Sequence, residues 1–194
     1  MPSTLIVVAA VDDRFEDNIK ALKARHGGWV VRSDTSMGGH PSAAFIREYH
    51  RNPGFDSYLF LQDSLEPVAD DVVFPFVAAD AEVVSWARFP MFFDNDYQAQ
   101  WVLSQGYTVQ PLWGIFGPIF YATRAAMERA ELWFPRTPRI RLEAQGTERA
   151  WAFTFQQAGD KVAHLHEWSN GHLASGEAHP FKKTFALRPD VEAA

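Results

Sequence analysis

The stretch at residues 55–67 (FDSYLFLQDSLEP) most constrains the fold, because it joins a short apolar run to a cluster of carboxylates. Residues 58–61 (YLFL) are continuously apolar, which is typical of a strand buried on both faces of a parallel sheet. Asp63 follows where such a strand ends, and open α/β sheets bind ligands outside the carboxyl ends of their strands. The same residues are also good turn formers, since Asp63-Ser64 favours a turn and Pro67 favours a turn or a helix start.

Short apolar runs alternate with amphipathic segments before this stretch. Residues 5–11 (LIVVAAV) predict a strand, and the apolar spacing of residues 15–22 predicts a helix after it. Residues 29–32 (WVVR) predict a second strand, and residues 45–49 place two aromatic side chains one helical turn apart. Parallel strands joined by right-handed crossovers end at one edge of the sheet. We therefore expect an α/β domain with a mostly parallel central sheet flanked by helices.

The pattern after residue 67 is mixed. Residues 68–79 have helical spacing, but Pro75 should kink or end that helix near Phe74. Residues 82–88 (EVVSWAR) predict a strand, and residues 97–105 predict a helix closed by the glycine that follows.

Two later glycine-bearing segments complete the predicted elements. Residues 113–121 (WGIFGPIFY) are aromatic and rich in strand formers, and their glycines suggest a bulge or a close ligand. Thr123 is placed to cap a short helix. A further helix is predicted to begin at residues 146–148 (GTE) and to end at Gly159, with a returning strand at residues 161–165.

Composition bounds the class of protein. The 194 residues, 47% of them hydrophobic, suit one folded domain, which we place at residues 1–165 with a C-terminal tail at residues 166–194 packing on or near the site. The net charge of −6 disfavours a broad nucleic-acid-binding surface, and the lack of cysteine excludes disulfides and thiolate catalysis. No apolar run reaches the roughly 18 residues of a membrane span, and residues 5–11 lack a basic signal-peptide region. We expect a soluble, cytoplasmic protein.

Four segments, in this order, resemble nucleotide-sugar glycosyltransferases of the GT-A type. They are the opening strand that ends in acids (5–11), the strand YLFLQD (58–63), the glycine-containing GIFGPIFYATRAAMERA (114–130) and TERAWAFTFQQAGDKVAHL (147–165). The resemblance implies a single Rossmann-like GT-A domain. It also implies transfer of a sugar from a nucleotide-diphosphate donor to an acceptor hydroxyl group. The acceptor is a saccharide or another compound.

The resemblance assigns the donor side of the site. Asp63 matches the first aspartate of the family's Asp-x-Asp motif, whereas Leu65 stands in place of the second and Glu66 follows it. A divalent metal, Mn²⁺ or Mg²⁺, is implied with Asp63 and His172 as ligands, and the departure at Leu65 leaves metal dependence open. The implied donor-binding residues are Val11, Asp12, Asp13, Arg32, Asp34 and Asp63.

The resemblance also assigns the catalytic and acceptor residues. Glu148 matches the carboxylate that serves as general base in inverting members, where the acceptor hydroxyl must lose its proton as it attacks. A glutamate in a first helical turn is also stabilised by the helix dipole whatever its function. The implied acceptor-binding residues are Trp113, Gly114, Phe116, Gly117 and Trp151.

Two other functions stay open. Leu65 in the motif favours a non-catalytic nucleotide-sugar-binding or assembly module of the same fold. His164 and His166 share one side of a predicted strand, as ligands of a metal hydrolase would, although ordinary strand histidines show the same spacing. A literal Asp-x-Asp at residues 94–96 lies outside the expected strand context and is interpreted as a surface or acceptor-loop acid.

Overall fold

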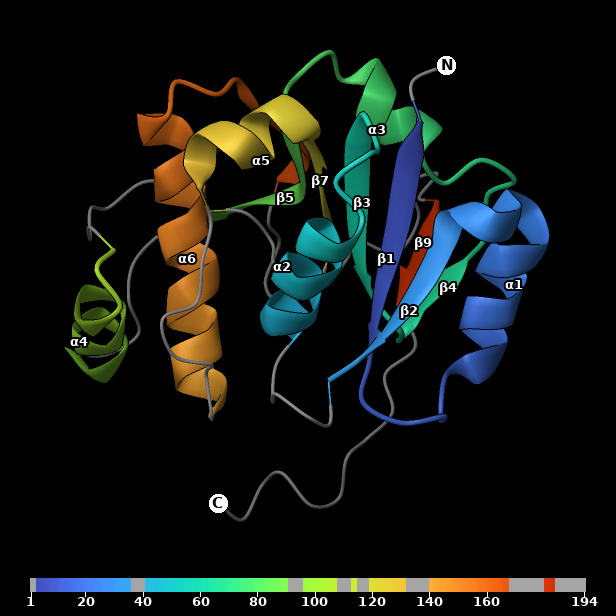
Figure 1. The fold of residues 1–194 in the computed structure, drawn as a ribbon, viewed down its shortest axis with the longest axis horizontal. Coiled ribbons are helices and arrows are strands. Elements are labelled where there is room, and N and C mark those ends of the chain that lie inside the picture. The colour runs from blue at the N-terminus through green and yellow to red at the C-terminus, as the bar shows by residue number, and fades with distance from the viewer. Residues whose placement is uncertain are drawn as a thin grey trace.

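A computed structural model describes residues 3–35, 41–90, 96–107, 113–114, 119–131, 140–167 and 180–183 (Figure 1). The strands, in chain order, are β1 (Thr4–Ala10), β2 (Val30–Asp34), β3 (Ser57–Gln62), β4 (Leu65–Pro67), β5 (Val83–Pro90), β6 (Trp113–Gly114), β7 (Ile119–Thr123), β8 (Val162–Glu167) and β9 (Phe181–Lys183). The helices are α1 (Glu16–His26), the short 3₁₀ helix η1 (Gly27–Trp29), α2 (Pro41–Arg51), α3 (Phe74–Ala78), α4 (Asp96–Ser104), α5 (Arg124–Ala130) and α6 (Arg141–Gln157).

The main sheet has the strand order β2-β1-β3-β7-β5-β6, and β8 pairs with β5. The pairs β1–β2, β1–β3 and β5–β8 are parallel, whereas β7 runs antiparallel between β3 and β5, and β6 is antiparallel to β5. The strands β1, β2, β3, β5 and β8 therefore point in one direction, against β6 and β7. The predicted α/β class with a mostly parallel sheet is confirmed.

The central strands β1 and β3 are buried on both faces, as their unbroken apolar runs predict. Their side chains alternate between two cores, so that Tyr58 and Phe60 join one and Leu59 and Leu61 the other. The first core also contains side chains of α2, α5 and α6, and the second contains side chains of α1 and α3. Helices accordingly cover both faces of the sheet (Figure 1).

Three local predictions about proline and glycine are wrong. Pro75 lies in the first turn of α3, where its missing N–H costs nothing, so it begins a helix rather than ending one. Pro67 belongs to β4 and does not start a helix. Gly146 lies inside α6, which begins at Arg141.

Gly146 serves helix packing. A Cβ atom built on it would lie 3.2 Å from the main-chain oxygen of Gln98 and 3.2 Å from Cγ1 of Val102, both on α4. The absence of a side chain thus allows α4 and α6 to approach closely. By contrast, the predicted cap of α5 is confirmed, because Oγ1 of Thr123 accepts a hydrogen bond from the Ala126 N–H at 3.2 Å.

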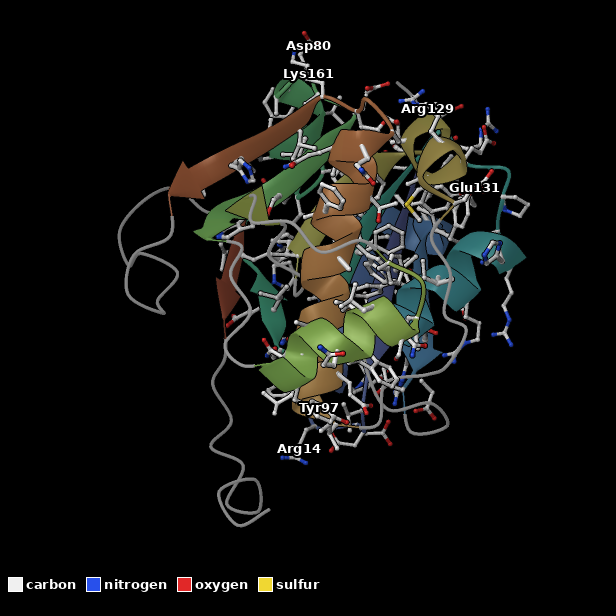
Figure 2. All side chains as sticks on the ribbon, turned by 90° about the vertical axis from the view of Figure 1, so that its left-hand side faces the viewer. Arg14, Asp80, Tyr97, Arg129, Glu131 and Lys161 are labelled. Atoms are coloured by element: carbon white, nitrogen blue, oxygen red, sulfur yellow. The ribbon has the colours of Figure 1, made fainter. Side chains whose placement is uncertain are left out.

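Ion pairs fasten the amino ends of β5 and β8. Arg129 on α5 donates from Nε to Oδ1 of Asp160 at 2.8 Å and also pairs with Glu82. Burial raises the pKa of Asp160, whereas the Lys161 N–H and Arg129 lower the pKa of Glu82. Figure 2 places Arg129 and Lys161 at the opposite end of the molecule from Arg14, which follows β1. These charges therefore lie far from the carboxyl ends of the parallel strands.

No helix within the described ranges combines the length and the hydrophobicity that a membrane crossing requires.

Candidate functional site

The carboxyl ends of β2, β1 and β3 lie side by side, as the sequence predicts. In the two parallel registers, Ala10 is opposite Asp34 and Ala9 is opposite Gln62. Neighbouring strands are about 4.8 Å apart, so the ends of β2 and β3 are separated by roughly 10 Å, with β1 between them. This edge brings together three of the predicted donor-binding residues, Val11, Asp34 and Asp63.

Asp63 is hydrogen-bonded to the end of β1. Its N–H donates to the main-chain oxygen of Ala9 at 3.1 Å, and its Oδ2 accepts the N–H of Val11 at 3.3 Å. The residue is 8% exposed. Asp63 and Ser64 also form the predicted turn, directly after the predicted strand, which is β3.

Asn18 is a residue of this edge that sequence reasoning missed. From α1 its Nδ2 donates to the main-chain oxygen of Asp63 at 2.9 Å. An asparagine inside a helix is unfavourable relative to most polar residues. That cost is the signal that could have singled it out.

The loop after β1 is tied to β2 by Arg32. This guanidinium pairs with Asp13 at 2.6 Å and with Glu16, and it lies 3.4 Å from the main-chain oxygen of Asp12. Its hydrogen bond to Asp13 raises the pKa of Arg32. In the same loop, Arg14 donates from Nε and Nη2 to Oδ2 of Asp12, at 3.0 and 2.7 Å. Of the predicted donor residues, Arg32 therefore contacts both Asp12 and Asp13.

A second cation at the end of β2 was not predicted. Arg47 on α2 donates from Nη2 to the main-chain oxygen of Asp34 at 2.6 Å and to Oγ of Ser33 at 2.7 Å. The Ser33 hydroxyl in turn donates to Glu48 at 3.0 Å, and Glu48 is 5% exposed. The buried carboxylate of Glu48 thus fixes the Ser33 hydroxyl, and this hydroxyl holds Arg47 at the sheet edge.

The residues after Asp63 fit only part of an Asp-x-Asp metal site. Leu65 is 1% exposed and packs in the core, so that position supplies no ligand. Among the residues the structure describes, no group of three or more His, Asp or Glu side chains could hold a metal ion. Mg²⁺ often uses one or two carboxylates together with substrate phosphates, and Asp63 fits the role of a single protein ligand. His172 lies outside the described residues.

Glu148 lies within α6, and only its backbone is described. Because α6 begins at Arg141, Glu148 is not in the first helical turn, and the alternative explanation by the helix dipole does not apply to it. The acid in that turn is Glu143, which is 6% exposed and accepts a hydrogen bond from the Tyr97 hydroxyl at 2.7 Å.

The predicted acceptor residues are placed unevenly. Trp151 is 1% exposed, and its Nε1 donates to the Tyr107 hydroxyl at 3.1 Å. A ring without free surface cannot stack on a sugar, so the acceptor role assigned to Trp151 is corrected to a core role. Trp113 and Gly114 form β6, against which α6 packs. Phe116 and Gly117 lie outside the described residues.

The two strand histidines behave as ordinary strand residues. On β8, His164 is opposite Ser85, and the ring of His166 lies 4.9 Å from the ring of Trp86. The described part of the chain provides no third ligand for a metal there. Of residues 94–96, Asp94 and Asn95 lie outside the described residues, and Asp96 begins α4.

Comparison by sequence finds no relative. No protein-family model matches the chain, and no curated protein matches it.

Comparison by structure finds similar folds. A mutant of Drosophila β1,4-galactosyltransferase 7, in complex with manganese, UDP-Gal and xylobiose, matches with a TM-score of 0.52 and 10% identity, over 95% of this chain and 71% of that one. The bifunctional IspDF of Campylobacter jejuni matches with a TM-score of 0.49 and 9% identity, over 84% of this chain. The chain spans about half (49%) of that protein's length. The galactosyltransferase match establishes a fold of the GT-A kind and nothing finer.

Proposed function

We propose that this chain transfers a sugar from a nucleotide-diphosphate donor to a hydroxyl acceptor. The observation that carries the proposal is the meeting of Val11, Asp34 and Asp63 at neighbouring strand ends of a GT-A-like fold. A galactosyltransferase of this fold was captured with UDP-Gal and manganese, which supports a nucleotide sugar as the ligand class.

The donor is proposed to lie across the carboxyl edge. Val11, Asp12 and Asp13 are proposed to face the nucleoside, with Arg32 holding Asp13 in place from β2. The guanidinium of Arg47 is proposed to supply positive charge at the end of β2. The span of roughly 10 Å from β2 to β3 suits a nucleoside joined to a diphosphate.

The diphosphate is proposed to lie at Asp63, directly or through Mn²⁺ or Mg²⁺, with His172 as a further ligand. A divalent ion bound there would neutralise the charge that develops on the leaving diphosphate. The hydrogen bond from the N–H of Val11 to Oδ2 of Asp63, which fixes this carboxylate at the strand end, supports that role.

Glu148 is proposed as the general base of an inverting transfer. The acceptor oxygen forms a bond to the anomeric carbon while the bond from that carbon to the diphosphate oxygen breaks. The diphosphate leaves with the electron pair, and the acceptor proton passes to the carboxylate. The segment around Gly114, with Trp113, Phe116 and Gly117, is proposed to shape the acceptor pocket.

A non-catalytic nucleotide-sugar-binding or assembly module is the second candidate. The burial of Leu65 favours it, because the second acid of the motif is missing, and so does the burial of Trp151, which removes one expected acceptor contact. Slow hydrolysis of the donor by water separates the two, since an active transferase site transfers some sugar to water and a binding module does not.

Calorimetric titration of UDP, GDP, CDP and dTDP, each with and without Mn²⁺, tests the proposal. We expect one nucleotide to bind saturably and Asp63→Ala to weaken it at least tenfold. Asp17→Ala is the matched control, because Asp17 is exposed and pairs with Lys20 alone among the contacts described for it. If none of the four nucleotides binds, both a transferase and a nucleotide-sugar-binding module are rejected.

A further inference from the structure

Strand β9 pairs with β4, which begins two residues after Asp63. In this antiparallel pair Lys183 is opposite Leu65 and Phe181 is opposite Pro67. The pairing continues where Val68 and Ala69 donate their N–H groups to the main-chain oxygen of Pro180, at 2.8 and 3.3 Å. Figure 1 shows β9 and β4 side by side.

Both strands of this pair are anchored in the same core. Phe181 is 3% exposed and Leu65 is 1% exposed, and both pack in the core between the sheet and the helices α1 and α3. Ile6, Val8 and Leu61, from the strands that carry the candidate site, belong to this core as well. The aromatic ring of Phe181 therefore ties β9 to the site strands.

We propose that β9 is a positioning element for Asp63, with Phe181 as its anchor. The inference rests on the proposed function, because the donor nucleotide is the ligand that Asp63 would hold. One residue separates Asp63 from Leu65, so a shift of β4 would displace the carboxylate that the Val11 N–H orients. A site with a single protein carboxylate depends strongly on where that carboxylate lies.

The position of Asp63 has two supports. The first is the pair of hydrogen bonds by which Ala9 of β1 and Asn18 of α1 hold its main chain. The second is the pairing of β9 with β4, which follows Asp63 in the chain. Loss of the second support would leave the turn attached at one side, so the nucleotide would meet a displaced or mobile carboxylate.

Nucleotide affinity tests the inference, with Phe181→Ala compared with Phe76→Ala. Phe76 is 0% exposed and packs in the same core from α3, so its truncation controls for a general loss of stability. The four nucleoside diphosphates are titrated with Mn²⁺ at a temperature where circular dichroism shows every variant folded. We expect Phe181→Ala to weaken binding at least tenfold, Phe76→Ala to stay within threefold, and Phe181→Leu to restore binding. Equal affinities in the two alanine variants would overturn the inference.

Amide hydrogen exchange provides a readout that needs no nucleotide. The N–H groups of Asp63 and Val11 are hydrogen-bonded in the native structure. We expect their exchange to be at least tenfold faster in Phe181→Ala than in Phe76→Ala. Unchanged exchange, or equal acceleration in both variants, would overturn the inference. If the unaltered protein binds none of the nucleotides, the proposed function fails. The comparison of hydrogen exchange between the two alanine variants then decides by itself whether β9 positions Asp63.

Discussion

The side chain of Asn18 holds the main chain of Asp63. Its Nδ2 donates to the Asp63 carbonyl oxygen at 2.9 Å, across 45 residues of sequence. The bond links α1 to the residue that directly follows β3. Helix α1 is thus part of the framework of the candidate site as well as a cover for the sheet.

We predict that Asn18→Ala weakens nucleotide binding and lowers the free energy of unfolding by about 1 kcal/mol, the usual contribution of one hydrogen bond. Urea unfolding and calorimetric titration measure the two effects. Asn52→Ala is the matched control, because the Asn52 Nδ2 donates to the main-chain oxygen of Glu48 at 3.0 Å, at the end of α2. A similar loss of affinity in both variants would contradict a specific role for Asn18.

Glu148→Gln is expected to abolish sugar transfer and donor hydrolysis while leaving donor affinity nearly intact, because the amide keeps the shape but cannot accept the proton. Release of nucleoside diphosphate measures turnover, and calorimetry measures affinity. Glu128→Gln, on the exposed surface of α5, is the control. Retained turnover in Glu148→Gln would rule out the role of general base.

Gly146→Ala is expected to destabilise the protein by about 1 kcal/mol. Alanine gains roughly 1 kcal/mol over glycine inside a helix, but overpacking costs about 1–3 kcal/mol. The added Cβ would press on the main-chain oxygen of Gln98, which cannot rotate away. Gly28→Ala meets no atom within 4 Å and should be neutral or slightly stabilising in the same thermal unfolding measurement. A stabilised Gly146→Ala variant would show that α4 yields easily.

Alkaline pH is expected to weaken the fold through Tyr58. Burial raises the pKa of Tyr58 from 10.0 to about 12, and its hydroxyl donates to the main-chain oxygen of Asn52 at 2.7 Å. The native state therefore binds this proton more tightly than the unfolded chain. The stabilisation is complete below pH 10 and is lost as the pH rises toward 12, by up to about 3 kcal/mol.

Urea unfolding at pH 9 and pH 11 measures this loss. Tyr58→Phe should be less stable at pH 9, because it lacks the hydrogen bond, and should lose less stability on going to pH 11. An equal pH dependence in both proteins would show that Tyr58 does not titrate with folding.

The sheet was predictable where burial alone decides the structure. The runs that became β1 and β3 are short, rich in strand formers and apolar on both faces, which is typical of a strand in the middle of a covered sheet. The order of these strands then placed Val11, Asp34 and Asp63 at one edge without further information.

The errors arose at residues whose role is set by contacts with segments distant in sequence. Gly146 suggested a helix start, but it is small because α4 packs against it. Trp151 suggested a sugar contact, but its ring fills the core beside Phe120. Asn18 belonged to no motif, since its partner, Asp63, lies in a turn 45 residues away in sequence. Such roles are set by tertiary contacts, which local patterns do not encode.

The pairing of β5 with β8 and of β4 with β9 has a consequence for biosynthesis. Both early strands gain these partners from the last elements that the structure describes. While the chain emerges from the ribosome, β4 and β5 are synthesised before β9 and β8. Until then, the edges that pair with these partners have unpaired main-chain hydrogen-bonding groups. Such late, distant pairings slow folding and expose edges to aggregation. These edges become covered only once β8 and β9 have been synthesised.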